Sequence, residues 1–203
     1  MKKILLMMLT LLFTLSLCGC QTKSDKNIEI TSSELDPEEI INVNLDVELY
    51  EILLCEEFEY TLTQRQKKDG FISISKAEGN KAVFTIKRKD YNSFKNQLLS
   101  SRKDIFELYN EKSSDNCIVK VEYNPTITEI TVTVNKNVYN PQIDISSNEY
   151  LKAYNCITGC GRNATLYHMY SLGETEKCIV TVKDYTSGSV IQTLTYPNML
   201  YNN

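Results

Sequence analysis

Two cysteines four positions apart, Cys156 and Cys160, have the residue type and spacing that could do chemistry most directly. Residues at positions i and i+4 share one face of a helix, so the pair could form a strained disulfide or act as redox thiols. Together with His168, the pair could also bind a metal ion. The spacing is not Cys-x-x-Cys and no second ligand pair is close in sequence, so we interpret both as small buried residues. We predict no metal site and no cofactor, and keep Cys156 and Cys160 as a candidate thiol pair.

Three further cysteines, Cys55, Cys117 and Cys178, lie between residue 21 and the end of the chain. With the candidate pair they make an odd number, which leaves at least one free thiol in an oxidising compartment unless two chains are cross-linked. The chain has one histidine, His168, and a general base needs a partner that the fold fixes beside it. Neither Gly-x-Ser-x-Gly nor His-Glu-x-x-His occurs. We expect a satisfied helix histidine and predict that the protein is not an enzyme.

The chain has thirteen tyrosines, six phenylalanines and no tryptophan. Tyrosine rings can stack on a carbohydrate, although the largest aromatic platform, tryptophan, is missing. We expect the tyrosines of the C-terminal half to divide between the core and its rim rather than to form one binding surface. These residues are Tyr139, Tyr150, Tyr154, Tyr167 and Tyr170.

The first twenty residues have the organisation of a targeting segment. Lys2 and Lys3 precede an uncharged stretch over residues 4–17, which ends in Leu17-Cys18-Gly19-Cys20. The apolar stretch is typical of a signal peptide and is too short to span a hydrocarbon core of about 30 Å. An ordinary secretory signal with a later cleavage site, or an uncleaved N-terminal anchor, would also fit the charge and the apolar stretch.

The end of this segment resembles the lipobox of bacterial lipoproteins, which has an aliphatic residue, a variable residue, a small residue and then an obligatory cysteine. The resemblance implies that Cys20 receives a diacylglycerol carrying acyl chains such as palmitate, and that residues 1–19 are removed as a signal peptide. It also implies a membrane partner through the lipid on Cys20. The abundance of Lys, Asn, Ile and Tyr resembles proteins of low-GC Gram-positive bacteria, where such a protein lies on the extracytoplasmic face of the cell membrane.

Composition and charge divide the remaining chain into three parts. The formal net charge of -4 for 203 residues argues against a nucleic-acid partner, and 42% hydrophobic residues are enough for a core. Residues 20–35 are polar and predict a lipidated tether. Residues 36–64 form an acidic lead-in segment without a basic residue. Residues 65–203 carry 18 basic and 14 acidic residues and are expected to form the globular domain.

The acidic lead-in segment admits two structures. An alternation of apolar and polar residues, as in a strand with one buried face, runs over Val43, Leu45, Val47 and Leu49. Asp36 followed by Pro37 could equally begin a helix. So many carboxylates suggest calcium, but the sequence lacks an Asp-x-Asp-x-Asp-Gly loop, and we favour a solvated acidic face.

Three hairpins separated by two helices are predicted in the globular domain. The hairpins cover residues 71–88, 117–135 and 178–196, rich in Ile, Val, Thr and Tyr with Gly, Asn or Pro at the turns. The helices run from Asp90 to about Tyr109 and from Ser147 to Leu172. The order ββ-α-ββ-α-ββ predicts an α+β fold with one antiparallel sheet of about six strands and both helices on one face.

The predicted sheet has an apolar side that the helices should cover, and two glycines in the second helix, Gly159 and Gly161, indicate a kink or a close approach to a neighbour. The residues expected under the helices are Ile72, Ile74, Phe84, Ile86, Val119, Val121, Val132, Val180 and Val182. The layout over residues 70–196 resembles small uncharacterised lipoproteins of Gram-positive gut bacteria, which implies a fold and a location but no activity.

These features together predict a membrane-anchored extracytoplasmic lipoprotein with a non-catalytic binding domain. Its expected partner is an envelope protein or a cell-wall component. One alternative is a small-ligand-binding lipoprotein that works with a transporter. Another is a thiol redox protein that uses Cys156 and Cys160.

Overall fold

The computed structural model describes residues 35–111, 117–139 and 147–201. Residues 36–203 form one compact unit. The predicted signal peptide, the lipobox with Cys20 and the tether up to residue 34 lie outside the described residues.

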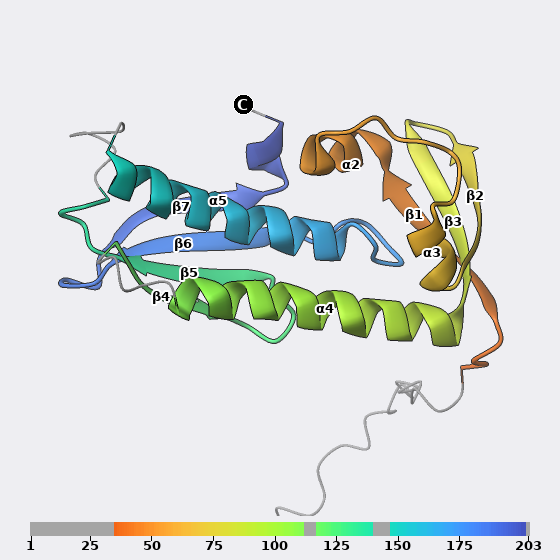
Figure 1. Cartoon of the computed structure of the whole chain (residues 1–203), viewed down its shortest axis with the longest axis horizontal. Helices are drawn as coiled ribbons and strands as arrows, with labels where there is room; N and C mark the ends of the chain where they lie inside the picture. The colour runs from red at the N-terminus through yellow and green to blue at the C-terminus, as the bar shows by residue number, and fades with distance from the viewer. Residues whose placement is uncertain (1–34, 112–116, 140–146, 202–203) are drawn as a thin grey trace, which may run out of the picture. The chain divides into compact units, whose positions relative to one another are not determined.

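Seven strands in two sheets and four α-helices make up the described part of the chain (Figure 1). The strands are β1 (Ile40–Asp46), β2 (Phe71–Ala77), β3 (Lys81–Lys87), β4 (Ile118–Tyr123), β5 (Glu129–Val134), β6 (Cys178–Asp184) and β7 (Val190–Tyr196). The helices are α2 (Val47–Leu54), α3 (Gln64–Lys68), α4 (Arg88–Glu111), α5 (Asn148–His168) and the short 3-10 helix η3 (Asn198–Leu200). The predicted α+β class is confirmed.

The prediction of one antiparallel sheet is wrong. One sheet has three antiparallel strands in the order β1-β3-β2, and the other has four in the order β4-β5-β6-β7. Within the second sheet β5 and β6 are parallel, because α5 carries the chain back to the other end of the sheet between them. The observed order also begins with β1, α2 and α3, which the predicted order ββ-α-ββ-α-ββ did not contain.

The acidic lead-in segment forms both a strand and a helix. β1 buries Val43 and Leu45 and pairs with β3 along its whole length. At Asp46 the backbone turns, and the Asp46 side chain accepts a hydrogen bond of 3.0 Å from the Leu49 amide as the N-cap of α2. The alternation that predicts a strand up to Leu49 therefore ends three residues earlier. Asp36 begins a turn, not a helix, since its carboxylate accepts from the nearby Glu38 amide.

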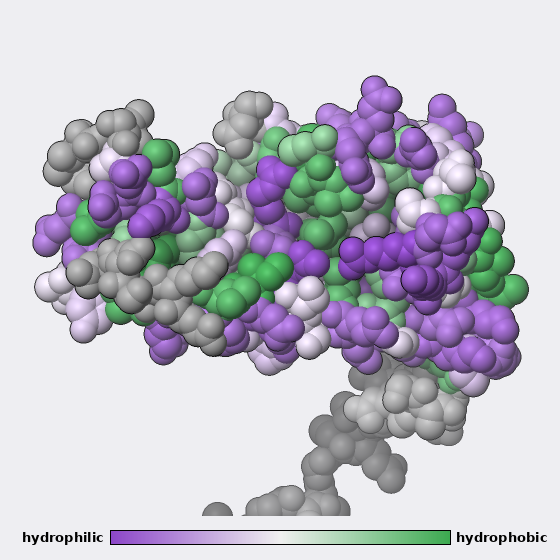
Figure 2. Space-filling model, in the orientation of Figure 1, coloured by the Kyte–Doolittle hydropathy of each residue, from purple (hydrophilic) through white to green (hydrophobic). Residues whose placement is uncertain are grey.

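Bulges explain why two residues expected under the helices are exposed instead. The pairing of β2 with β3 shifts between Phe71 and Ser73, and the pairing of β4 with β5 shifts between Ile118 and Lys120. An extra residue at a bulge reverses the alternation locally, so Ile72 is 50% exposed and Val119 37% exposed. Figure 2 shows apolar side chains at the surface over the edge formed by β2. Ile74 is half-buried, and the other expected residues are buried: Phe84, Ile86, Val121, Val132, Val180 and Val182.

The two long helices lie on the four-stranded sheet. α5 packs on β5, β6 and β7, while α4 packs on β4, on α5 and also on β3 of the other sheet. The N-cap of α5 is Ser147, whose hydroxyl accepts a hydrogen bond of 3.1 Å from the Tyr150 amide. This helix ends at His168, four residues before the predicted end.

Glycines in α5 mark close approaches to two tyrosines. A Cβ atom on Gly159 would overlap the hydroxyl of Tyr109 in α4, and one on Gly161 would overlap the buried ring of Tyr196 in β7. The predicted close approach is confirmed at both positions. Only glycine allows α5 to lie this near to β7.

We predict that Gly161→Ala lowers the free energy of unfolding by about 2 kcal/mol, because the added methyl group must displace the Tyr196 ring from a packed core. This loss is a net value, which already includes the gain of about 1 kcal/mol in helix propensity that alanine brings. The control is Gly173→Ala, where a Cβ atom meets no other atom within 4 Å, so its stability should change by less than about 0.5 kcal/mol. Urea denaturation measures both, and equal midpoints for the two variants would contradict the prediction.

Candidate functional site

The candidate thiol pair lies on the buried face of α5. Cys156 and Cys160 are both buried and form no disulfide. The hydrogen bond to Cys156 and burial raise the pKa of the Cys160 thiol well above its ordinary value. A redox thiol reacts as its thiolate and needs a lowered pKa and access to solvent. The surroundings of this pair therefore disfavour redox chemistry and resemble those of small core residues.

The other three cysteines come from separate segments of the chain. Cys117 is buried and lies 3.0 Å from the Glu149 carbonyl oxygen, and burial raises the pKa of its thiol. Burial also raises the pKa of Cys178 to about 12. Cys55 is exposed at the end of α2, whereas Cys178 lies close enough to Cys160 to contribute to the raised pKa of that thiol.

His168 lies at the C-terminal end of α5 and is 2% exposed. Its Nδ1 atom is 3.5 Å from a carboxylate oxygen of Glu176. Its Nε2 atom is buried and has no hydrogen-bond partner among the described residues. Burial lowers the pKa of the imidazole, while Glu176 opposes this effect. The backbone at Ile127 and Thr126 also favours the protonated imidazole, so this helix histidine has polar neighbours besides Glu176.

Lys95 of α4 lies next to this histidine and binds a backbone carbonyl in the last turn of α5. Its ammonium group donates a hydrogen bond of 2.8 Å to the Tyr167 carbonyl and lies 3.5 Å from the centroid of the Tyr167 ring. Burial lowers the pKa of Lys95 to about 8. A cation at this position satisfies a carbonyl at the C-terminal end of the helix, so the cluster has a structural role.

The acidic residues do not gather into a metal site. No group of three or more His, Cys, Asp or Glu side chains is placed to hold a metal ion within residues 35–111, 117–139 and 147–201. In the lead-in segment, Glu38 pairs with Lys87 and Lys89, and Glu39 pairs with Arg88. The hydrogen bonds from the two lysines lower the pKa of Glu38 to about 2.

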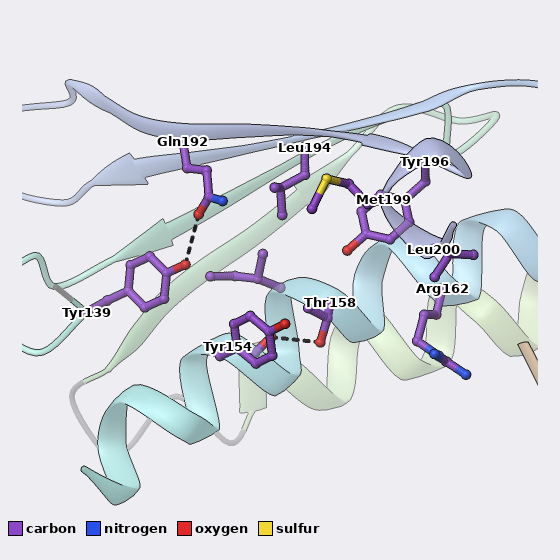
Figure 3. A pocket seen from close by; sticks show the side chains of 10 residues that line it. Tyr139, Tyr154, Thr158, Arg162, Gln192, Leu194, Tyr196, Met199 and Leu200 are labelled. Carbon is purple, nitrogen blue, oxygen red and sulfur yellow. Dashed lines mark hydrogen bonds between the residues drawn. The ribbon is translucent and has the colours of Figure 1, made fainter. Parts of the chain in front are cut away.

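A cavity of about 210 Å³ lies between α5, β7 and η3 (Figure 3). Its floor is apolar, and three tyrosine rings surround it. The apolar residues are Ile157, Leu194, Met199 and Leu200, and the tyrosines are Tyr139, Tyr154 and Tyr196. Apolar lining with a few polar groups is the usual composition of a small-molecule site.

A stack of tyrosines leads from the core to this cavity. The rings of Tyr139 and Tyr150 are parallel within 5° with centroids 5.2 Å apart, and the Tyr154 ring lies 6.2 Å beyond that of Tyr150. Tyr139 and Tyr150 are buried, whereas Tyr154 is 40% exposed. The predicted division of these tyrosines between core and rim is confirmed. The stack holds the Tyr154 ring in place while leaving part of it open to solvent.

Three polar side chains complete the cavity. The Tyr139 hydroxyl donates a hydrogen bond of 3.0 Å to Gln192 Oε1, and the Thr158 hydroxyl donates one of 2.8 Å to the Tyr154 carbonyl. Arg162 donates from Nη2 to the last carbonyls of α2, those of Ile52 and Leu53. Figure 3 shows the Arg162 guanidinium directed away from the cavity, so its stem contributes to the lining and its charge does not.

Sequence reasoning missed Gln192, Thr158 and Arg162. One signal was present for Gln192, since alternation along β7 places it on the same face as Leu194 and Tyr196, which are buried. A polar residue on the buried face of a strand needs a partner or a ligand. Thr158 and Arg162 gave no such signal, because their roles depend on η3 and α2, which approach α5 only in the folded chain.

A second cavity, of about 220 Å³, lies between the start of α2 and the loop that follows α5. Its charged residues are Asp46, Lys81 and Glu174. Asp46 already serves as a helix cap, and a carboxylate and an ammonium group in one cavity compensate each other. This cavity is therefore a weaker candidate for a ligand site.

Comparison of the chain with protein-family models, curated proteins and solved structures found no match. Among the residues that the structure describes, no helix is both long and apolar enough to cross a membrane. The choice of functional site therefore depends on geometry and chemistry alone.

We predict that acid destabilises the protein below about pH 6.5, because the folded state holds the pKa of His168 below its ordinary value. The unfolded chain then binds the proton more readily, and stability falls as the pH falls, by at most about 1.4 kcal/mol per pH unit. Lys95 does not contribute between pH 7 and 5, since its pKa of about 8 leaves it protonated there. Glu38, with its pKa of about 2, contributes only at lower pH.

Urea midpoints at pH 7 and pH 5 measure this effect. His168→Gln should flatten the dependence, since glutamine does not titrate. Glu176→Gln should steepen it, since the carboxylate that favours the protonated imidazole is removed. Equal stability of the unmodified protein at the two pH values would contradict the prediction.

Proposed function

We propose that this chain is a lipoprotein anchored through Cys20 on the extracytoplasmic face of the membrane, and that residues 36–203 bind a component of the cell envelope without catalysis. The observation that carries the binding role is the cavity between α5, β7 and η3, in which an exposed tyrosine ring and an amide surround an apolar floor. The tether between lipid and domain would place this cavity outside the membrane surface.

The anchor is supported by the first twenty residues. Lys2 and Lys3, the apolar stretch over residues 4–17 and the sequence Leu17-Cys18-Gly19-Cys20 occur in the order that lipid attachment requires. Two acyl chains on one cysteine bind a bilayer stably, since each buried methylene group contributes about 0.8 kcal/mol. A lipid would thus hold the domain at the membrane without a spanning helix.

The absence of reactive groups around the cavity supports binding rather than catalysis. No Asp, Glu, His, Lys or Cys side chain is among the residues that the structure describes around it. Tyr139, whose hydroxyl donates to Gln192, has its pKa raised to about 12 by burial and stays neutral. A general acid or base needs a pKa near the working pH, and the side-chain types that most often supply one do not line this cavity in the described part of the chain.

The small volume of the cavity favours one alternative, a ligand-binding lipoprotein that delivers a small molecule to a transporter. Both functions use the same cavity and the same anchor. They differ in whether the ligand is free in solution or part of the insoluble envelope. The redox alternative is less favoured, because Cys160 has a raised pKa and both Cys156 and Cys160 are buried.

For the anchor, we predict that Cys20→Ala abolishes both acylation and retention in the membrane fraction when the full chain is expressed in a bacterium with lipoprotein-processing enzymes. The readouts are incorporation of an alkyne-labelled fatty acid and cell fractionation. Cys18→Ala is the matched control, since it removes a thiol two residues away and should leave both readouts unchanged. Unchanged acylation of Cys20→Ala would refute the proposed anchor.

For the binding role, we predict that the detergent-solubilised full chain co-sediments with insoluble cell-envelope material washed free of lipid. Tyr154→Ala should weaken this binding about fivefold or more, because it removes the exposed ring at the cavity. Tyr185→Ala is the control, since Tyr185 is 65% exposed and lies outside the cavity. Absence of co-sedimentation, with binding confined to soluble compounds, would favour the transporter alternative.

A further inference from the structure

We infer that the cavity between α5, β7 and η3 binds a neutral sugar ring, with one face of the ring against Tyr154 and its hydroxyl groups on Gln192 and Thr158. This inference deepens the proposed binding function and rests on it. Charge, hydrogen-bonding capacity, aromatic surface and size each restrict the ligand, and a sugar ring meets all four restrictions.

Charge excludes an ionic ligand. Arg162 is the one charged residue that lines the cavity within the described part of the chain. Its Nη2 atom is held by the Ile52 and Leu53 carbonyls at 3.0 and 2.7 Å, and its guanidinium points out of the cavity (Figure 3). A carboxylate, phosphate or ammonium group would enter an apolar space without a counter-charge, which is strongly unfavourable. The ligand is therefore neutral.

Hydrogen-bonding capacity favours hydroxyl groups. Gln192 uses Oε1 to accept from Tyr139, and no acceptor for its Nε2 group is recorded among the described residues, so Nε2 is available to donate. Thr158 donates its own proton to the Tyr154 carbonyl and has lone pairs available to accept. The ligand must accept from Gln192 and donate to Thr158. A hydroxyl group does both, and a sugar ring carries several.

The aromatic surface favours a ring with an apolar face. Tyr154 is the open end of the stack that begins at the buried Tyr139 and Tyr150, so its orientation is fixed before a ligand binds. The C–H face of a sugar ring packs on such an aromatic ring while its edge remains polar. Ile157 and Leu194 provide apolar contact in the same cavity.

Size restricts the ligand to about one ring. The cavity of about 210 Å³ is smaller than the roughly 300–1,000 Å³ of sites that enclose drug-sized molecules. One sugar unit of a longer glycan could enter while the rest of the glycan remains outside. This fits the envelope partner of the proposed function.

The test measures Kd by ligand-observed saturation-transfer NMR on the detergent-solubilised full chain. The probes are methyl β-glucoside, methyl N-acetyl-β-glucosaminide and p-cresol. We expect at least one sugar to bind with a millimolar Kd, and Gln192→Glu to weaken it at least about tenfold. This variant keeps the acceptor for the Tyr139 hydroxyl and replaces the Nε2 donor. Gln97→Glu is the control, since it adds the same charge on α4, outside the cavity.

A second variant keeps the test decisive if Gln192→Glu does not fold. Thr158→Val preserves the shape of the side chain and removes its oxygen, so it should weaken sugar binding several-fold. Failure of both sugars to bind at about 20 mM would overturn the inference, as would an unchanged Kd in the folded variants. Binding of p-cresol alone would also overturn it and would identify a site for apolar rings.

The outcome separates this inference from the proposed function. If the full chain co-sediments with envelope material in a Tyr154-dependent way but neither sugar binds, the sugar inference is wrong and the binding function stands. If neither co-sedimentation nor sugar binding is observed, both are wrong.

Discussion

Close packing of α5 against the four-stranded sheet is the constraint on which the rest of the structure depends. The buried face of this helix carries small residues, among them Ala153, Cys160, Gly161 and Ala164, which let the backbone approach β6 and β7. Gly161 has no room for a methyl group beside Tyr196. In this setting the cysteines act as small apolar residues of suitable volume. The cavity lies beside this close contact, since the Tyr196 ring that packs against Gly161 also lines the cavity together with Gln192 and Leu194.

The charged residues act at two separate places, with different consequences. The ion pairs of Glu38 and Glu39 with residues 87–89 lie at the surface, where solvent screening makes the contribution of each pair to stability small. They join the acidic lead-in segment to the start of α4, and β1 contributes the buried apolar contacts. His168, which lies beside Lys95 in the first half of α4, is buried, and its Nε2 atom has no hydrogen-bond partner among the described residues. Loss of one surface ion pair should therefore change stability little, whereas the buried His168 makes the free energy of folding depend on pH.

Local patterns predicted local structure well in this chain. The hairpins, the two long helices and the buried alternation at Val132, Val180 and Val182 depend on neighbours in sequence. Errors arose where distant segments decide the outcome. The bulges at Ile72 and Val119 depend on pairing register with another strand, and the parallel pairing of β5 with β6 depends on where α5 directs the chain. Of the candidate site, the sequence singled out Tyr139 and Tyr154, as two of five tyrosines expected to divide between core and rim. It could not bring Gln192, Thr158 and Arg162 to them, since β7, α5 and α2 meet only through tertiary packing.

The parallel pair of β5 and β6 has a consequence for the order of folding. The β2–β3 and β4–β5 hairpins form from neighbouring residues, but β5 finds its second partner only after residues 135–177 have followed it. Until then β5 presents a free row of backbone amide and carbonyl groups, and the apolar side of the β4–β5 hairpin lacks the cover of α5. Such contacts between distant segments form slowly, since a long loop must close first. The partly folded chain, before β6 has paired with β5, is thus the state most prone to pair with another copy of itself. By covering the sheet and bringing β6 beside β5, α5 also protects the protein from aggregation.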